Sequence, residues 1–317
     1  MMPRMNENNE NVSKSILEHD CSTYSYVAER LSQTATNILF LGETNPIQKG
    51  RTFLVKCGKR FLHYNYVCAI LNDLFGIQSR GGCQCSGPYS QHLLGLTKLV
   101  NGKEIPNDEN DLIESALLHY KERAELLRPG YTRLSLPFKG LRGEEIEYVV
   151  KALEWVAKHA WSLICQYRCN HRTGEWRHFS RQGKPLGRTE RRWLSHFDLS
   201  TNQTSNVSMN GMMSEKKLTD ILDEAFENAN YQLQVAQSEQ KHMKQAMKMT
   251  DDSAILDGDE NLESLRWYVY PKECAQFLMQ AYSTVPETLS STILGAIHPL
   301  NETNKMFSEE NEPSKSK

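Results

Sequence analysis

The chain has 317 residues, a formal net charge of -2 and 24% charged residues. This length fits one large domain or two ordinary ones, and so small a net charge gives no overall field to attract nucleic acid or an anionic membrane. The eight cysteines are scattered, and no apolar run is typical of a signal peptide or a membrane span. We therefore predict reduced thiols, a cytoplasmic location and no membrane partner.

The first third of the chain alternates between helical and extended patterns. Residues 1–15 are polar and rich in asparagine, so they are expected to be disordered. Apolar spacing then predicts a helix, two strands and a second helix, in chain order over 22–33, 37–41, 52–56 and about 62–75. Gly76 is the expected C-cap of the second helix, and a loop rich in Gly, Cys, Ser and Pro follows at 79–90.

The middle of the chain continues this alternation. Asp111 and Glu114 have the spacing of a capping box and predict a helix that Pro129 and Gly130 end. A strand is predicted over 131–138. A helix is then predicted from Glu144 and Glu145, with a buried stripe at Ile146, Val149, Val150, Leu153, Val156, Ala157 and Ala160. Residues 163–169 and 175–179 are expected to pair as a hairpin.

The composition changes after residue 180. Residues 181–214 have the composition of a linker, and 215–283 are predicted to form an extension: a long polar helix over 215–248, a strand-like segment at 265–270 and a short helix with Pro271 in its first turn. The tail 284–317 is expected to be disordered. The ordered core is therefore predicted over 16–180, with an α/β or α+β fold.

Arg133 lies in the middle of an apolar predicted strand. A buried guanidinium is costly unless it is paired, and its rigid fork suits a carboxylate. Arg133 is therefore a candidate ligand-binding residue. The alternative is an arginine that is exposed at a strand end or paired with a local glutamate.

Cys83 and Cys85 lie in the glycine-rich loop, one residue apart and close to Arg80. An accessible thiol near a cation can act as a nucleophile. The alternative is that both are small packing residues. The remaining Cys and His residues form no second matched pair, so no metal site is predicted.

The segment 168–193 is basic and includes two tryptophans, Trp176 and Trp193. Such a stretch can follow a phosphate backbone. In a slightly acidic chain, however, a solvated hairpin and linker is the favoured interpretation, and a nucleic-acid partner is not expected.

Parts of the chain resemble the C-terminal part of class V aminotransferases, in the branch close to cysteine desulfurases and selenocysteine lyases. The similarity covers roughly residues 15–180, with a weaker echo at 265–275. Four segments carry it: 61–63 (FLH), 71–78 (LNDLFGIQ), 80–89 (RGGCQCSGPY) and 128–133 (RPGYTR).

The resemblance implies the C-terminal small domain of a fold-type-I enzyme that depends on pyridoxal 5'-phosphate, acts on an amino acid and is usually a homodimer. Arg133 falls at the family's arginine for the substrate α-carboxylate, and Arg80 is a second expected substrate contact. One desulfurase class has the pattern Arg-x-Gly-His-His-Cys. Here Arg80, Gly82 and Cys85 keep that spacing, while Cys83 and Gln84 replace the two histidines. Cys85 would then be the catalytic thiol that attacks the substrate sulfur and carries a persulfide.

The large domain that bears the cofactor lysine in this family has no counterpart in the 317 residues, so no cofactor-binding residue is predicted. Without that lysine, this chain alone is not expected to be a competent transaminase or desulfurase. Two hypotheses remain open: part of a pyridoxal phosphate enzyme whose missing domain is encoded upstream, or a shortened, non-catalytic binding module.

Overall fold

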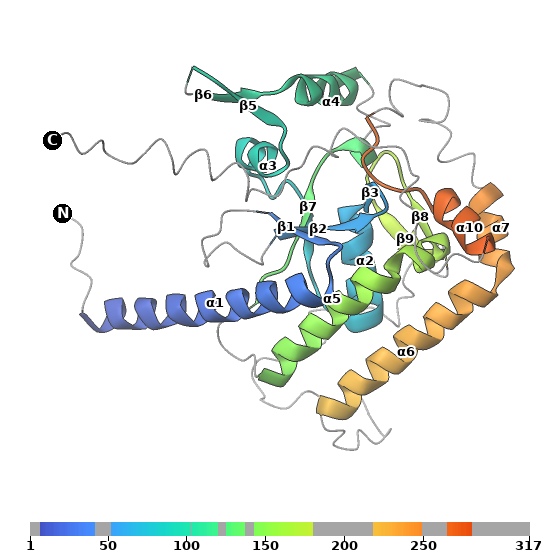
Figure 1. The fold of residues 1–317 in the computed structure, drawn as a ribbon, viewed down its shortest axis with the longest axis horizontal. Helices are drawn as coiled ribbons and strands as arrows, with labels where there is room; N and C mark the ends of the chain where they lie inside the picture. Colours follow the sequence, from blue (N-terminus) through green and yellow to red (C-terminus); the bar gives the residue numbers. More distant parts are fainter. Residues whose placement is uncertain are drawn as a thin grey trace, which may run out of the picture.

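The computed structural model describes residues 7–41, 52–101, 103–119, 125–136, 143–179, 218–248 and 265–280. At its centre is an antiparallel sheet surrounded by helices (Figure 1). This mixture of helices and small antiparallel sheets agrees with the α+β form of the prediction. The disordered tail and the linker of the prediction lie outside the described residues, as do 1–6.

The central sheet has five strands. Four of them follow the order β1-β2-β7-β4, and β3 pairs with the C-terminal end of β2, which β7 does not reach. Every pairing is antiparallel. The strands are β1 (Ile38–Leu41), β2 (Thr52–Cys57), β3 (Arg60–Leu62), β4 (Arg80–Gly82) and β7 (Tyr131–Arg133). β1 and β2 were predicted, whereas β4 was expected to be loop. The predicted strand over 131–138 is only three residues long in the structure, because 134–136 leave the sheet.

Helix α1 (Glu7–Thr34) begins 15 residues before the predicted start at residue 22. Residues 7–15, which were expected to be disordered, are therefore helical. The buried side chains of Tyr24, Val27 and Leu31 anchor the C-terminal half of α1 in the core. With no Gly or Pro between residues 7 and 21, each further residue of the helix adds a hydrogen bond without a new nucleation step.

Helix α2 (Tyr64–Phe75) follows β3 directly. The backbone N–H of Asn65 donates to Nδ1 of His63, which caps the first turn at 3.1 Å. Gly76 ends the helix with φ of +65°, the left-handed conformation that was predicted for this C-cap. Because residues 60–62 pair with β2, the helix starts at 64 rather than 62.

After β4 the chain leaves the sheet in an excursion that lies at the top of Figure 1. The excursion consists of α3 (Gly87–Leu93), the hairpin of β5 (Thr97–Val100) and β6 (Lys103–Pro106), and α4 (Asp108–His119). The predicted capping box at Asp111 is wrong. Helix α4 starts three residues earlier, because the side chain of Asn107 accepts a hydrogen bond from the Asn110 backbone N–H at 2.9 Å.

Helix α5 (Gly143–Leu163) confirms the predicted stripe, with Val150, Val156 and Ala160 fully buried. A short 3₁₀ turn, η2 (Ile164–Gln166), precedes the hairpin of β8 (Tyr167–Cys169) and β9 (Trp176–His178). The predicted hairpin is therefore present, but its first strand begins four residues later than expected because Leu163 still belongs to α5.

The C-terminal extension packs into the same hydrophobic core. Helices α6 (Leu218–Ser238) and α7 (Gln240–Lys248) replace the single predicted helix, and α10 (Pro271–Met279) begins at the predicted proline. Residues 265–270 are extended and buried. They run beside β3, where the Phe61 N–H donates to the carbonyl of Trp267 at 3.2 Å.

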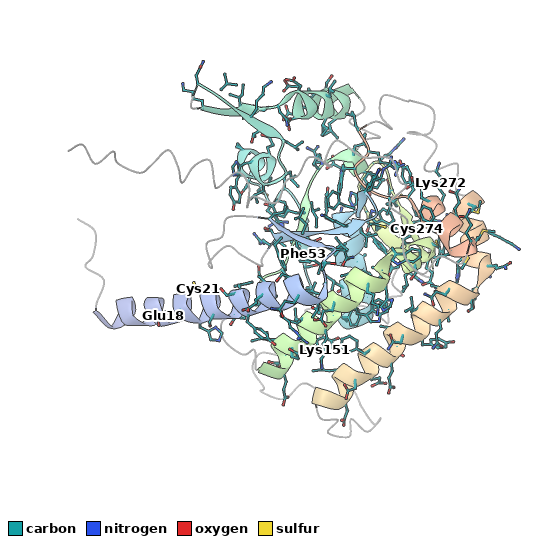
Figure 2. The ribbon with its side chains drawn as sticks, viewed as in Figure 1. Glu18, Cys21, Phe53, Lys151, Lys272 and Cys274 are labelled. Carbon is teal, nitrogen blue, oxygen red and sulfur yellow. The ribbon has the colours of Figure 1, made fainter. Side chains whose placement is uncertain are left out.

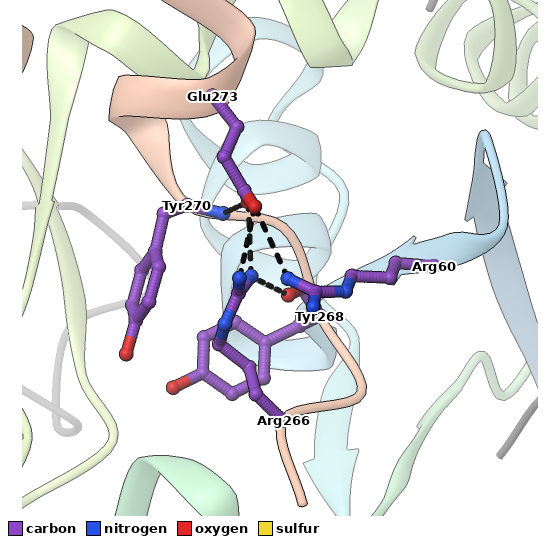
Figure 3. Close-up of polar contacts among 5 residues, drawn as sticks. All are labelled: Arg60, Arg266, Tyr268, Tyr270 and Glu273. Atoms are coloured by element: carbon purple, nitrogen blue, oxygen red, sulfur yellow. Dashed lines mark hydrogen bonds and ion pairs between the residues drawn. The ribbon is translucent and has the colours of Figure 1, made fainter. Parts of the chain in front are cut away.

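A buried ion cluster fixes this extension to the sheet (Figure 3). One oxygen of Glu273 lies 3.1 Å from Arg60 Nη1 and 2.8 Å from Arg266 Nη2, while its other oxygen accepts from Arg266 Nη1 at 2.9 Å. Removing two charged groups from water is costly, and here a shared carboxylate offsets that cost.

None of the described helices is long and apolar enough to cross a bilayer.

Candidate functional site

The strand pairing of β4 with β7 brings two predicted site residues together. Arg80 is the direct cross-strand partner of Arg133. Side chains at directly opposed positions of an antiparallel pair project from the same face, where like charges repel. Neither guanidinium has an ion-pair partner in the part of the chain that the structure describes. The site thus has two adjacent positive charges, and no described residue supplies a carboxylate to them.

The glycines of this segment have a different role from the one predicted. The sequence predicted a flexible loop here, but Gly81 lies in strand β4. A Cβ atom on Gly81 would lie 2.6 Å from side-chain atoms of both Tyr64 and Asn65, and one on Gly130 would lie 2.7 Å from the Gly82 Cα. Gly81 and Gly130 therefore allow β4 to lie close to α2 and β7. The α2 side of the sheet is the Gly81 face, so the arginines project from the opposite face.

A tight turn follows β4. The Ser86 N–H donates to the carbonyl of Cys83 at 3.0 Å, and the two residues between them, Gln84 and Cys85, have φ of +57° and +63°. Two successive positive φ angles are typical of a type I′ turn, which usually contains Gly or Asn. For other L-residues this conformation costs roughly 1–2 kcal/mol each. Such strain persists only where the surroundings fix it.

Two side chains hold this turn in place. The Ser90 hydroxyl donates to the Cys83 carbonyl at 2.6 Å and lies 3.2 Å from the Tyr131 hydroxyl on β7. The side-chain amide of Gln84 donates to the carbonyl of Arg80 at 3.1 Å. The turn is thereby tied both to α3 and to the sheet.

All eight cysteines are described, none of them forms a disulfide with another, and Cys85 is the only exposed one. Arg80 Nη2 donates to its sulfur at 3.4 Å. All three residues predicted for the site therefore come together: Arg80 lies across the strand pair from Arg133 and its side chain contacts Cys85. By contrast, burial raises the pKa of Cys68, on the α2 side, despite hydrogen bonds to Ser79 and Thr132 that lower it.

Two polar atoms at this site are buried without a hydrogen-bond partner among the described residues: the Arg133 Nε–H donor and the Gln84 Oε1 acceptor. Buried polar groups are normally paired, so these two atoms are positions where a bound molecule could make a hydrogen bond. Sequence reasoning identified Arg133 but missed Gln84 and Ser90, which only the turn geometry reveals.

A cavity of about 1050 Å³ lies elsewhere, between α1, α5 and α6. Its wall includes Lys56, Lys151, Lys158, Glu147 and Glu154, and Figure 2 shows Lys151 on α5. Acidic and basic side chains alternate along this wall, and the three lysines are exposed. It therefore has no preference for one charge, and Arg80, Cys85 and Arg133 do not line it. The arginine site has the more specific chemistry, because two guanidinium groups and a thiol lie together there.

The described residues contain no cluster of Cys, His, Asp or Glu suited to a metal ion. Comparisons of the chain with family models, with curated proteins and with solved structures find no match. The function must therefore be argued from the site itself.

Proposed function

We propose that Arg80 and Arg133 bind the carboxylate of an amino acid and that Cys85 presents a thiol to the bound molecule. This site would be the substrate-contacting half of a cysteine desulfurase-like enzyme of the class V aminotransferase type. In that assignment the chain is the C-terminal small domain. The resemblance adds one further role, in which Cys85 receives the substrate sulfur as a persulfide.

The observation that carries the proposal is the cross-strand pair of arginines, to which no described residue supplies a carboxylate. Arg133 is half buried, and its Nε–H has no acceptor among the described residues. A carboxylate between the two guanidinium groups would remove their repulsion and accept from this donor. The unpaired Gln84 Oε1 supports an amino acid in particular, because an ammonium group would give this oxygen a donor.

Pyridoxal phosphate fits this site poorly. The cofactor requires a lysine amine, and no lysine occurs in β4, in the turn that follows it or in β7. The site supplies guanidinium groups and thiols instead. No reaction step through the cofactor is therefore derived for this chain, and the expected homodimer likewise belongs to a complete enzyme.

The test is amino-acid binding, measured by calorimetry with cysteine and alanine. Arg133→Ala should weaken binding by roughly 10- to 100-fold, the range for a lost hydrogen bond between charged groups. Arg177→Ala is the matched control, since it removes an exposed arginine of a short strand that pairs with Glu175. Equal affinities of the wild-type chain and Arg133→Ala would refute the carboxylate clamp.

A carboxylate-binding module without catalysis is the second candidate, and the absence of a lysine from β4, the turn and β7 favours it. Neither candidate predicts an absorbance band of lysine-bound cofactor when pyridoxal phosphate is added to this chain alone. A stoichiometric band that maps to one lysine would contradict both, because it would show a cofactor lysine within the 317 residues.

A further inference from the structure

Cys85 is exposed, and Cys83 is half buried, as are Cys21 and Cys68. Four of the other six cysteines are buried, and burial raises the pKa of Cys165 to about 12, which keeps its thiol protonated. Cys83 is half buried and Cys85 is exposed, so both can meet a reagent in solution. Their position one residue apart has no counterpart elsewhere in the chain.

The turn places these two thiols within reach of each other. Two residues span at most about 7 Å even when fully extended, and here the chain bends back so that the Ser86 N–H meets the Cys83 carbonyl at 3.0 Å. A disulfide requires a Cα separation of roughly 4.4–6.8 Å. The spacing and the bend together keep the two Cα atoms within the upper end of that range.

The surroundings also distinguish the two thiols. Arg80 Nη2 donates to the Cys85 sulfur at 3.4 Å, which places a positive charge beside the more exposed thiol. Cys83 is held instead through its backbone, by the Ser90 hydroxyl. An exposed sulfur beside a cation is suited to attack, and a nearby half-buried thiol is suited to resolve the product.

We propose that Cys83 and Cys85 form a dithiol couple that reacts with disulfides and other thiol-seeking electrophiles, with Cys85 as the attacking thiol and Cys83 as the resolving thiol. This activity goes beyond the carboxylate site, because it does not depend on what the two arginines bind.

With glutathione disulfide as the oxidant, the couple reacts in two balanced steps. The Cys85 thiolate attacks one sulfur of glutathione disulfide, forms a mixed disulfide and releases one glutathione thiolate. Cys83 then attacks the Cys85 sulfur, releases the second glutathione and closes the Cys83–Cys85 bond. The chain loses two electrons and two protons, and one glutathione disulfide becomes two glutathiones. A bond closed over a single residue is strained, so an external thiol should reverse it readily.

The first experiment uses phenylarsine oxide, which bridges two neighbouring thiols with release of one water. Intact mass and peptide mapping of the full chain should show one bridge between Cys83 and Cys85. Cys83→Ser and Cys85→Ser should each abolish it. Cys21→Ser is the matched control, because it removes another partly exposed thiol on α1, shown in Figure 2, and should leave the bridge intact.

The second experiment separates the two roles. With glutathione disulfide, the wild-type chain should form the Cys83–Cys85 disulfide, Cys83→Ser should accumulate a mixed disulfide at Cys85, and Cys85→Ser should form little adduct. A mixed disulfide at Cys85 that persists equally in the wild type and in Cys83→Ser, with no arsenical bridge, would overturn the proposal. Circular dichroism checks that each variant is folded. Should a variant not fold, the mapped bridge in the wild-type chain decides alone.

Discussion

Two pairs of arginines lie at opposite ends of the same sheet, and only one pair has a carboxylate. Arg60 on β3 and Arg266 share the buried side chain of Glu273, whereas Arg80 on β4 and Arg133 on β7 lie opposite each other with no described acid between them. The first pair is complete within the chain. The second has the same charges without a counterion among the described residues, which is the arrangement that the proposed carboxylate site requires.

The two pairs also differ in what their surroundings fix. Figure 3 shows Glu273 reaching both arginines, and the same carboxylate accepts the Tyr270 N–H at 2.7 Å. At the other end of the sheet the arginine pair borders an exposed thiol on a strained turn. The two ends therefore differ in their carboxylate: Glu273 supplies it at one end, and no described residue supplies it at the other.

The largest test of this difference is Glu273→Ala. It leaves two nearly buried guanidinium groups without a counterion, so the free energy of unfolding should fall by about 3–5 kcal/mol, the cost of breaking a buried ion pair. Urea denaturation at neutral pH measures this change. Glu125→Ala is the control: it breaks a partly exposed pair with Arg128 and should cost no more than about 1 kcal/mol. Equal losses in the two variants would mean that the buried cluster is not a special support of the fold.

The pH dependence of stability tests the same buried end through His63. Its ring stacks on Trp267 of the C-terminal segment at 5.2 Å, and burial lowers its pKa to about 3, although a hydrogen bond to the Leu126 carbonyl opposes this shift. The folded value lies below the unfolded value near 6.5, so the unfolded chain takes up the proton first. Stability from this group is complete above about pH 6.5 and is lost as the pH falls towards 3.

At pH 5 the loss from His63 should be roughly 2 kcal/mol relative to pH 7. His63→Gln has no proton to gain here, so its unfolding free energy should change less between these pH values by about that amount. His92→Gln, on α3 in the excursion, should keep the wild-type dependence. If all three chains lost the same stability, burial would not set the protonation of His63.

The sequence predicts the locally determined parts of this fold. The stripe of α5, the Gly76 cap and the start of α10 at Pro271 depend on spacing or on one residue's conformational preference, and all three are confirmed. The β5–β6 hairpin was missed although the dipeptide Asn101-Gly102 between its strands is a strong hairpin signal in the sequence; Asn101 has φ of +52°. The charged residues of its strands conceal the alternation on which strand prediction depends.

Parts that depend on distant pairing could not be predicted. Arg60 and Glu273 are 213 residues apart, and no local pattern links them. Arg80, Cys85 and Arg133 were all named from the sequence, but their proximity follows from β4, which was predicted as loop because a strand containing two glycines has no apolar alternation. Gly81 is there for close contact with α2, which only the three-dimensional packing shows.

The smallest expected effect is also the most direct test of the comparison. In the absence of ligand, Arg133→Met removes one of two repelling charges and keeps a long apolar side chain. The free energy of unfolding should therefore stay unchanged or rise by about 0.2–1 kcal/mol, opposite in sign to Glu273→Ala.

Arg80→Met should act similarly, and the double variant should gain less than the sum of the two, because the repulsion can be removed only once. The gain should shrink in high salt, which screens exposed charges. Cysteine at a concentration that saturates the wild-type chain should then stabilise the wild type more than Arg133→Met, because the proposed carboxylate site is weakened in the variant. A loss of several kcal/mol in Arg133→Met without ligand would mean that Arg133 has a structural partner, as Arg60 does. That result would contradict its proposed role in ligand binding.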